Sequence, residues 1–289
     1  MAATLEVVDS GPLSTVQDLG RPGYAAIGVT ESGAADRASL RLANRLAGND
    51  EGAAAIEVTF GGFAARATTD VVVAVTGAPC PITVERRGAP MNAALRVPAG
   101  EEFRLGWPAT GLRSYVAVRG GIAVEPVLGS RATDLLSGLG PEPMRRGTVL
   151  PLGGASRCPA DPGFTPVAAP PSDELALRIL PGPRDDWFTE SALKTLLAQP
   201  YAVTSESNRI GIRLDGPVLP RARHGDLVGE GMVTGALQVP PSGKPTLFLA
   251  DHPVTGGYPV IAVVVTDDVD KAAQARPGLR VRFDLATVS

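Results

Sequence analysis

The side chains best suited to chemistry lie between two apolar runs near the C-terminus, TLFLA and VIAVV. The connecting sequence, DHPVTGGYP, brings together a carboxylate, an imidazole, a hydroxyl, two glycines and a phenol. The apolar runs predict two buried strands joined by a tight loop, and a tight hairpin needs only two turn residues. The surplus of reactive groups therefore indicates a binding or catalytic loop held on a rigid scaffold.

Three side chains of this region are predicted to be catalytic: Asp251, Gln238 and Lys244. Asp251 follows the first apolar run directly, so we expect it at a strand end on a concave surface. A carboxylate there can orient an amide N–H or act as a general base. We expect Gln238 to face it from a neighbouring loop, and Lys244 can present its charge to an anion. The alternative is that Asp251 only binds nearby backbone N–H groups and that His252 and Lys244 are ordinary loop residues.

The glycine pair of the same loop indicates close approach of the backbone to a ligand, because glycine has no Cβ. We therefore predict that the end of the loop contacts a substrate through Thr255, Gly256, Gly257 and Tyr258.

A second stretch, STVQDLGRPGYAAIGVTESGAADRASLRLANRLAGN at residues 14–49, is also richer in polar groups than a scaffold requires. Turn chemistry and a helix cap explain its glycines and Asp36, but they do not explain Gln17 or Arg21. We predict that Gln17, Arg21 and Tyr24 contact substrate, with a scaffold role for Gln17 and Arg21 as the open alternative.

The elements that must position these residues are mostly strands. Short β-type runs recur and are separated by glycine or proline: TLEVV, AIEVTF, DVVVAVT, PITVE, AALRV, EFRL and RSYVAVRGG. In the last of these, Arg113, Tyr115 and Ala117 alternate with Ser114, Val116 and Val118, which predicts a strand with one buried face.

Two helices are expected. The first runs from an N-cap at Asp36 to a stop at Gly48. The second begins at Asp185 or Asp186 and ends before Pro200, with Leu193, Leu196 and Leu197 on one side.

A Pro/Ala-rich segment at about residues 153–174 is the best candidate linker. It divides the chain into approximate lobes at 1–155 and 175–289. The pattern predicts an all-β, barrel-like fold with two lobes and few helices, because helices do not alternate with strands as a parallel βαβ fold requires.

Composition excludes several classes of function. The 289 residues carry 27 basic and 30 acidic side chains without a basic stripe, so nucleic-acid binding is not expected. Cys80, Cys158, His224 and His252 show no metal-ligand spacing, so we expect no metal site and two free thiols. The N-terminus lacks a signal peptide and the apolar runs are too short to span a membrane, so we expect a cytoplasmic protein.

Known cofactor motifs are absent as well. The sequence contains no P-loop, no GxSxG elbow, no HExxH and no GxGxxG pattern. It also lacks the AMKM segment that carries biotin, so no covalent biotin is expected on this chain.

Several long segments together resemble the biotin-dependent carboxyltransferase-like family, also called allophanate hydrolase subunit 2. They are TVQDLGRPGY, ESGAAD, ANRLAGN, IEVTFGG, YVAVRGGI, LGSRATD, SNRIGIRLDGP and ALQVPPSGKPTLFLADHPVTGGYPVIAVV. They span nearly the whole chain in order.

The resemblance implies a mainly β fold with two cyclophilin-like β-barrel lobes and a few short helices. It also implies one component of an ATP-dependent 5-oxoprolinase, a hydrolase that opens a small cyclic amide and uses ATP in the assembled complex. The implied partners are a subunit-1 protein (KipI-like, or the B subunit of 5-oxoprolinase) and a lactam-utilisation protein (the A subunit). The alternatives are a regulatory protein that antagonises a subunit-1 kinase inhibitor and a carboxyltransferase half-domain that acts on urea or an amide with carboxybiotin.

Overall fold

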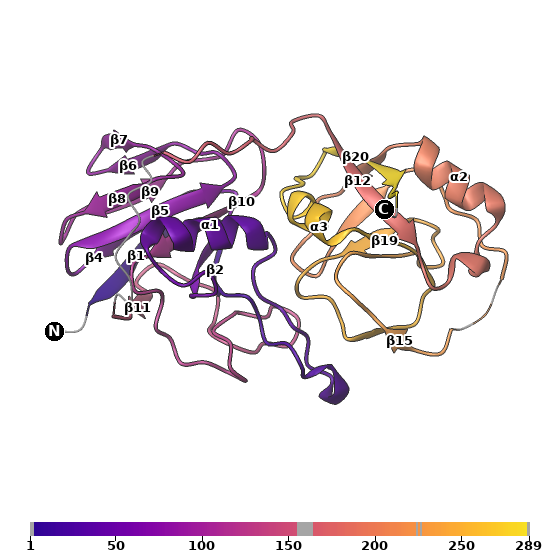
Figure 1. The fold of residues 1–289 in the computed structure, drawn as a ribbon, viewed down its shortest axis with the longest axis horizontal. Coiled ribbons are helices and arrows are strands. Elements are labelled where there is room, and N and C mark those ends of the chain that lie inside the picture. Colours follow the sequence, from indigo (N-terminus) through magenta and orange to yellow (C-terminus); the bar gives the residue numbers. More distant parts are fainter. Residues whose placement is uncertain (1–2, 155–163, 224, 226, 288–289) are drawn as a thin grey trace. The chain divides into compact units, whose positions relative to one another are not determined.

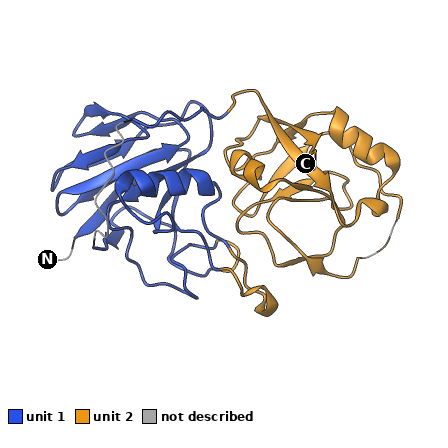
Figure 2. Cartoon of the chain, viewed as in Figure 1, with its two compact units in different colours: residues 1–21, 32–134, 138–170 blue, residues 22–31, 135–137, 171–289 orange. Residues whose placement is uncertain are grey.

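The computed structural model describes residues 3–154, 164–223, 225 and 227–287 (Figure 1). Cys158, His224 and the central part of the predicted linker lie outside the described residues. The chain forms two compact units (Figure 2): unit 1 comprises residues 1–21, 32–134 and 138–170, and unit 2 comprises residues 22–31, 135–137 and 171–289. Because two segments from the N-terminal half belong to unit 2, the units are not separated by one cut in the sequence, and the lobe limits 1–155 and 175–289 stay a prediction.

Unit 1 is built on two antiparallel sheets. The six-stranded sheet has the order β11 (Val149–Pro151), β1 (Thr4–Ser10), β4 (Phe63–Ala67), β9 (Glu102–Leu105), β6 (Ile82–Val84) and β7 (Arg87–Ala89). The five-stranded sheet has the order β2 (Leu13–Gln17), β3 (Ala55–Thr59), β10 (Arg113–Val118), β5 (Val71–Gly77) and β8 (Ala94–Val97). Each of the seven runs expected from the sequence as a strand forms one, which confirms that local pattern.

The core of unit 1 lies between the inner faces of these sheets. Val7 and Phe103 of the six-stranded sheet and Val58 and Val116 of the five-stranded sheet belong to one buried apolar cluster. Burying such side chains is the main favourable term in folding, at about 25 cal/mol per Å² of apolar surface.

Strand β10 differs from its expected half-buried state, because all six of its residues are buried. Helix α1 (Arg37–Ala47) contacts β10 and β5 on the outer face of the five-stranded sheet (Figure 1). Tyr115 and Ala117 pack there with Leu40 and Leu46. The expectation of one buried face was therefore wrong, since the helix removes the second face from water.

Helix α1 itself begins and ends as its capping residues predict. The Asp36 side chain accepts a hydrogen bond from the Ser39 N–H at the N-terminus. Gly48 has a left-handed backbone with φ 79° at the C-terminus, a conformation that glycine adopts without a steric penalty.

Unit 2 is a closed barrel. Its strands follow the order β12 (Glu174–Pro181), β19 (Val260–Val264), β16 (Ala236–Gln238), β17 (Thr246–Phe248), β14 (Gly211–Asp215), β13 (Tyr201–Val203) and β20 (Arg280–Leu285). Parallel pairing of β12 with β20 closes the barrel, which leaves no unpaired edge in this ring. The mainly β architecture with a barrel and few short helices is thus confirmed.

The apolar runs that flank DHPVTGGYP do form strands, β17 and β19, but they do not form a hairpin. Strand β16 lies between them and pairs antiparallel with both. The connection must therefore cross the end of β16 rather than turn tightly. Within it, β18 (Thr255–Gly256) pairs with β15 (Glu230–Gly231) as a small separate sheet.

The second expected helix starts later than predicted. Residues Asp185–Trp187 form the 3-10 helix η2, and α2 covers Glu190–Ala198 with Thr189 as its N-cap residue. The two aspartates thus occupy a separate turn. Leu196 is buried in the barrel core, and Leu193 and Leu197 pack against it, as predicted. Helix α3 (Thr266–Ala272) and the 3-10 helix η1 (Ala25–Ile27) complete the helical elements of the described residues.

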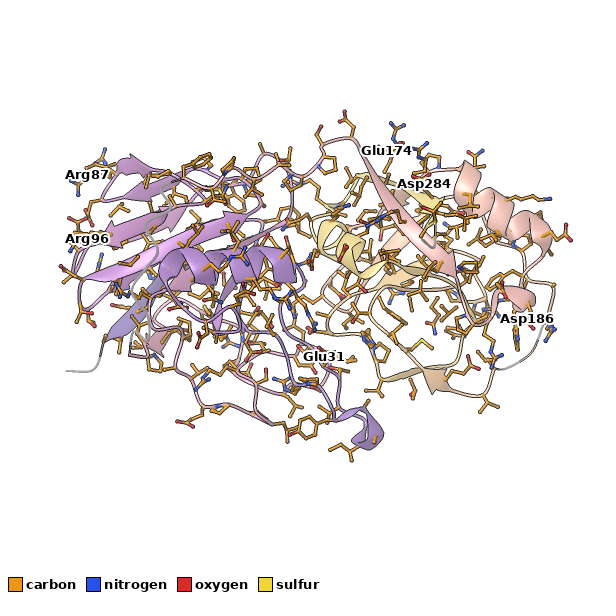
Figure 3. All side chains as sticks on the ribbon, in the orientation of Figure 1. Glu31, Arg87, Arg96, Glu174, Asp186 and Asp284 are labelled. Carbon is orange, nitrogen blue, oxygen red and sulfur yellow. The ribbon has the colours of Figure 1, made fainter. Side chains whose placement is uncertain are left out.

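Charged side chains are distributed over both units. The labelled side chains of Figure 3 include exposed Arg87 and Arg96 on unit 1 and exposed Glu174, Asp186 and Asp284 on unit 2. None of the helices in the described ranges is both long and apolar enough to cross a membrane.

Candidate functional site

A row of three polar residues crosses the outer face of the barrel. Strand register places Arg213 of β14 opposite Thr246 of β17, and Thr246 opposite Gln238 of β16. The next row, Ile212, Leu247 and Leu237, belongs to the barrel core. Because side chains alternate between the two faces of a strand, the polar row faces outward.

This polar row forms part of a hollow with a volume of about 200 Å³. Its other lining residues are Asn208, Ile210, Gly211, Pro240, Phe248 and Tyr258. A neighbouring hollow of about 370 Å³ shares Arg213, Pro240 and Thr246 with it. We call the first hollow the barrel groove.

Gln238, predicted as catalytic from the sequence, lies at the floor of the barrel groove. It is 8% exposed, and its Nε2 donates a hydrogen bond of 3.2 Å to the backbone carbonyl of Tyr258. Gly256 permits this placement, because a Cβ at that position would collide with the Gln238 amide. Gln238 is thus a strand residue rather than a loop residue, and the predicted loop holds it in place.

Tyr258 is the predicted substrate contact that lines the barrel groove. It is 44% exposed, and the guanidinium of Arg221 lies 5.9 Å from its ring centroid, within cation–π range. Arg221 also donates a hydrogen bond of 2.5 Å to the carbonyl of Val239. The loop before Tyr258 is held by the β15–β18 pairing, and Arg184 forms an ion pair with Glu230 of β15. Thr255 and Gly257 are exposed beside it.

Lys244 lines the neighbouring hollow and not the barrel groove. Its Nζ lies 2.5 Å from Asp215 Oδ1, in a pair whose side chains are about half exposed, and this pairing lowers the pKa of Asp215. Its charge is therefore already balanced at the surface.

Asp251 is fully buried and does not line either hollow. Its Oδ2 accepts a hydrogen bond of 2.9 Å from Arg209 Nε, and its Oδ1 accepts one of 2.9 Å from Arg209 Nη2. The backbone N–H of Leu135, in a segment that belongs to unit 2, donates to Oδ2 at 3.1 Å. This geometry supports a positioning role, and the catalytic role of Asp251 stays a prediction.

His252 is not a solvated loop residue, because it is only 7% exposed. Its ring stacks on Phe248 with centroids 6.0 Å apart, and its Nδ1 lies 2.8 Å from the carbonyl of Pro253. The imidazole thus packs against Phe248.

Gln17 and Arg21 lie in unit 1 and are buried, at 0% and 1% exposure. Gln17 Nε2 donates to the carbonyl of Thr133 at 2.9 Å, and Arg21 donates to the carbonyls of Val127 and Ala132. These bonds hold the loop at residues 127–133, which agrees with the scaffold alternative, and the substrate contacts of Gln17 and Arg21 stay a prediction. Tyr24 lies in segment 22–31, which belongs to unit 2, and is partly exposed.

Comparison with known proteins assigns the chain to a family. A family model described as carboxyltransferase domain, subdomain A and B, matches residues 27–285. The chain belongs to this carboxyltransferase family. The resemblance predicted from the sequence is confirmed.

Relatives of this carboxyltransferase-family chain match it over nearly its full length. The chain is 36% identical to the C subunit of 5-oxoprolinase from Escherichia coli, over 96% of this chain and 90% of that protein. It is 30% identical to the protein of the same name from Haemophilus influenzae, over 98% and 92%. The crystal structure of the K. lactis urea amidolyase superposes with a TM-score of 0.91 at 29% identity, over 99% of this chain but only 19% of that one.

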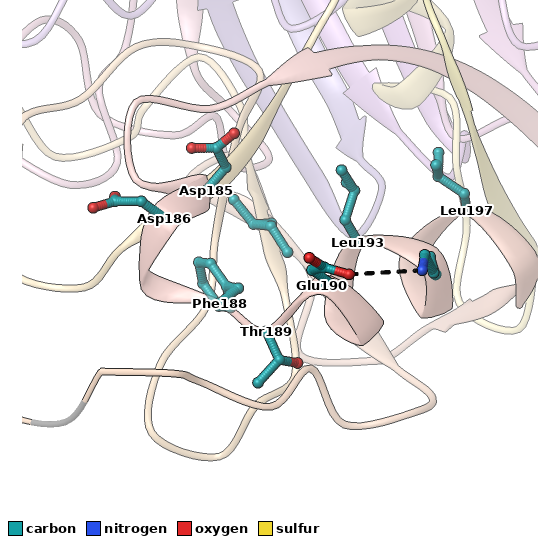
Figure 4. A pocket seen from close by; sticks show the side chains of 9 residues that line it. Asp185, Asp186, Phe188, Thr189, Glu190, Leu193 and Leu197 are labelled. Atoms are coloured by element: carbon teal, nitrogen blue, oxygen red, sulfur yellow. Dashed lines mark ion pairs between the residues drawn. The ribbon is translucent and has the colours of Figure 1, made fainter.

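The carboxyltransferase-family barrel has a further hollow beside α2, of about 560 Å³ (Figure 4). Figure 4 shows Leu193 and Leu197 of α2 together with the carboxylates of Asp185, Asp186 and Glu190. None of the side chains predicted for substrate or catalysis lines it.

The sequence analysis missed Arg209, Arg213 and Thr246. Arg209 lies in SNRIGIRLDGP, a segment that carried the family resemblance, and its burial had no local signal. Arg213 alternates with Ile212 and Leu214 in that segment, so period-2 reading marks it as outward-facing. Among the described residues, no group of three or more His, Cys, Asp or Glu side chains is placed to hold a metal ion.

Proposed function

We propose that this chain is one component of a multi-subunit, ATP-dependent 5-oxoprolinase, which opens the lactam of 5-oxoproline to L-glutamate. The observation that carries the proposal is the match to two proteins named as the C subunit of 5-oxoprolinase, over at least 90% of their length. The barrel groove agrees with it, since amide, hydroxyl and guanidinium groups converge there on a space fit for a small polar ligand.

The proposed reaction adds water across the C–N bond of the lactam. The carbonyl carbon gains a bond to oxygen, its bond to nitrogen breaks, and the nitrogen becomes the amine of glutamate. A resonance-stabilised amide has a poor leaving group, so coupling to ATP supplies the activation that water alone lacks. The sequence contains no P-loop, so ATP binding is not assigned to this chain.

The side chains of this chain are assigned binding and positioning roles. Gln238 and Tyr258 line the barrel groove, and Gly256 lets the Gln238 amide keep its place. The buried pair of Asp251 and Arg209 anchors the start of the loop that ends at Tyr258. Positioned hydrogen-bond donors and acceptors of this kind orient a substrate for attack.

Partner proteins follow from the proposal. We expect a subunit-1 protein of the type found as the B subunit of 5-oxoprolinase, together with a lactam-utilisation protein as the A subunit. The reason is that relatives named as one subunit of an enzyme imply that other subunits exist. A stable interface would bury about 2,000 Å² or more.

A carboxyltransferase activity toward urea or another amide is the second candidate. It is favoured by the match to the urea amidolyase, of which this chain covers 19%. Carboxybiotin would then come from another polypeptide, because the chain lacks the AMKM segment.

The test is reconstitution with the partner proteins. The chain co-expressed with both expected partners should release glutamate from 5-oxoproline only when ATP is present, and the chain alone should be inactive. Carboxylation of urea by the assembled complex with a biotin carrier, without glutamate release, would favour the second candidate instead. Robust turnover by the single chain would contradict the multi-subunit proposal.

A further inference from the structure

We propose that the row Arg213–Thr246–Gln238 recognises a small amide that also carries a carboxylate. Arg213 would bind the carboxylate and Gln238 the amide N–H. The choice of 5-oxoproline as the ligand rests on the proposed function, whereas the recognition site itself rests on the geometry of the barrel.

The charge of the barrel groove favours an anionic ligand. Arg213 is the only residue lining the barrel groove that carries a formal charge at neutral pH. Within the described part of the chain its guanidinium has no ion-pair partner, in contrast to Lys244, which is paired with Asp215. The carboxylates of Glu206 and Asp215 line the neighbouring hollow only. A groove with a single uncompensated guanidinium favours an anion, and a planar carboxylate matches the guanidinium with two parallel hydrogen bonds.

The amide of Gln238 is held so that its oxygen is available to a ligand. Its Nε2 is committed to the Tyr258 carbonyl, so the orientation of the amide is set. Its Oε1 accepts no hydrogen bond from the described residues, although the side chain is more than nine-tenths buried. Solvent reaches this oxygen, so a ligand N–H that enters the barrel groove can replace a water bound to it.

The distance between Arg213 and Gln238 fits a small ligand. Neighbouring strands lie about 4.8 Å apart, so the backbones of Arg213 and Gln238 are separated by two such steps, roughly 10 Å. Thr246 lies midway along the row, on the strand between them. Since the two long side chains shorten this distance, a ligand whose carboxylate and amide are separated by one carbon can span the remaining gap.

The walls of the barrel groove complete the match. Phe248, Pro240 and Ile210 offer apolar surface on which the methylene groups of a small ring can pack. Tyr258 is held beside them by Arg221 and is more than one third exposed, so it can cover a bound ring. Specificity for a carboxylated lactam over a neutral one would then depend on Arg213.

The experiment compares Arg213→Gln with the wild type in the complex reconstituted with its partner proteins. We expect KM for 5-oxoproline to rise by about 10- to 100-fold, as loss of a charged hydrogen bond predicts, while kcat changes much less. Arg213→Lys should recover part of the loss. Arg282→Gln, which removes an exposed guanidinium from β20 of the same barrel, is the matched control and should leave KM unchanged.

Direct binding separates this inference from the proposed function. Calorimetry on the assembled complex should show 5-oxoproline binding to the wild type, weaker binding to Arg213→Gln, and little binding of 2-pyrrolidinone, which lacks the carboxylate. Binding that depends on Arg213 without any turnover would keep the recognition site and reject the 5-oxoprolinase assignment. Turnover with an unchanged KM in Arg213→Gln, or no binding by the wild type, would overturn the recognition site.

Discussion

The carboxylate of Asp251 and the guanidinium of Arg209 form a bidentate ion pair, with both nitrogen–oxygen distances at 2.9 Å. The side chains are 0% and 1% exposed, so the pair is removed from water. The backbone N–H of Asp251 also donates to the carbonyl of Arg209 at 3.1 Å. This double link ties the segment after β17 to the segment before β14, so Asp251 holds the start of the loop in place.

Asp251→Asn should therefore unfold more easily than the wild type. The change removes the negative charge from one partner of a buried ion pair, and breaking such a pair typically costs about 3–5 kcal/mol. Urea unfolding of the purified chain measures the loss. Asp215→Asn removes a carboxylate from a half-exposed pair and is the control, with an expected change below about 1 kcal/mol. Normal stability of Asp251→Asn together with lost turnover in the complex would instead support the catalytic role predicted from the sequence.

Tyr115→Phe should destabilise unit 1. The Tyr115 hydroxyl donates to Glu57 Oε2 at 2.7 Å and accepts from the Asp36 N–H at 2.8 Å. Burial and the negative charge of Glu57 raise the pKa of Tyr115 well above its ordinary value. Loss of the hydroxyl removes two buried hydrogen bonds, and we expect a cost of about 1–3 kcal/mol in the free energy of unfolding. A change near zero would show that water or rearrangement replaces these bonds.

Tyr201→Phe, unlike Tyr115→Phe, should not lower the free energy of unfolding. The Tyr201 hydroxyl, on β13, is buried and makes no hydrogen bond within the described residues. Burial raises the pKa of Tyr201 to about 12. Removing an unpaired buried hydroxyl should leave the free energy of unfolding unchanged or increase it by up to about 1 kcal/mol. Thermal unfolding of both tyrosine variants side by side gives the comparison, and a clear loss in Tyr201→Phe would contradict it.

Stability should also fall in alkali through Tyr201. Its pKa is raised in the folded state, so between about pH 10 and 12 the unfolded chain loses this proton first. The wild type should therefore lose stability relative to Tyr201→Phe as pH rises above about 10. Equal pH dependence of the two proteins in urea unfolding would refute this.

Protonation of Asp268 should account for part of the stability that unit 2 loses in acid. Its oxygens accept hydrogen bonds from the Arg178 N–H at 2.8 Å, from Arg178 Nε at 2.9 Å and from Lys271 Nζ at 2.6 Å. Burial alone would raise the pKa of Asp268, but these hydrogen bonds outweigh it and hold the pKa well below its usual value.

Because that pKa is lowered in the folded state, the stabilisation from Asp268 is complete above about pH 4 and is lost as pH falls further. The difference in unfolding free energy between the wild type and Asp268→Asn should be largest near pH 7 and shrink below about pH 4. Asp284→Asn, at an exposed position on β20, is the control. A difference that stays constant down to pH 2 would contradict the assignment.

Much of the local structure could be predicted from the sequence because it depends on neighbouring residues. Helix α1 is capped by Asp36 and Gly48 through bonds made within one or two turns. The start of α2 was missed, because two aspartates also suit a 3-10 turn before Thr189. Glycines, prolines and alternating apolar residues likewise marked the strands of unit 1.

The candidate site was predictable only in part. Gln238 and Tyr258 were selected by their residue types, and both line the barrel groove. Lys244 and Asp251 were selected by the same reasoning, yet one is paired at the surface and the other is buried. Residue type shows which chemistry a side chain can do, but it does not show which other residue forms an ion pair with that side chain in the fold.

By itself, the sequence determined the mainly β class and the capped helix after Asp36, since these follow from local composition and pattern. The family was identified by the resemblance of its long motifs. Tertiary structure decided which strands and side chains lie next to one another. It placed β16 between β17 and β19, paired Arg209 with Asp251 across 42 positions of sequence, and aligned Arg213, Thr246 and Gln238 in one row. The physical reason is that strand order and register depend on burying the apolar face of every strand at once, so they are set by long-range pairing and not by the residues of any single strand.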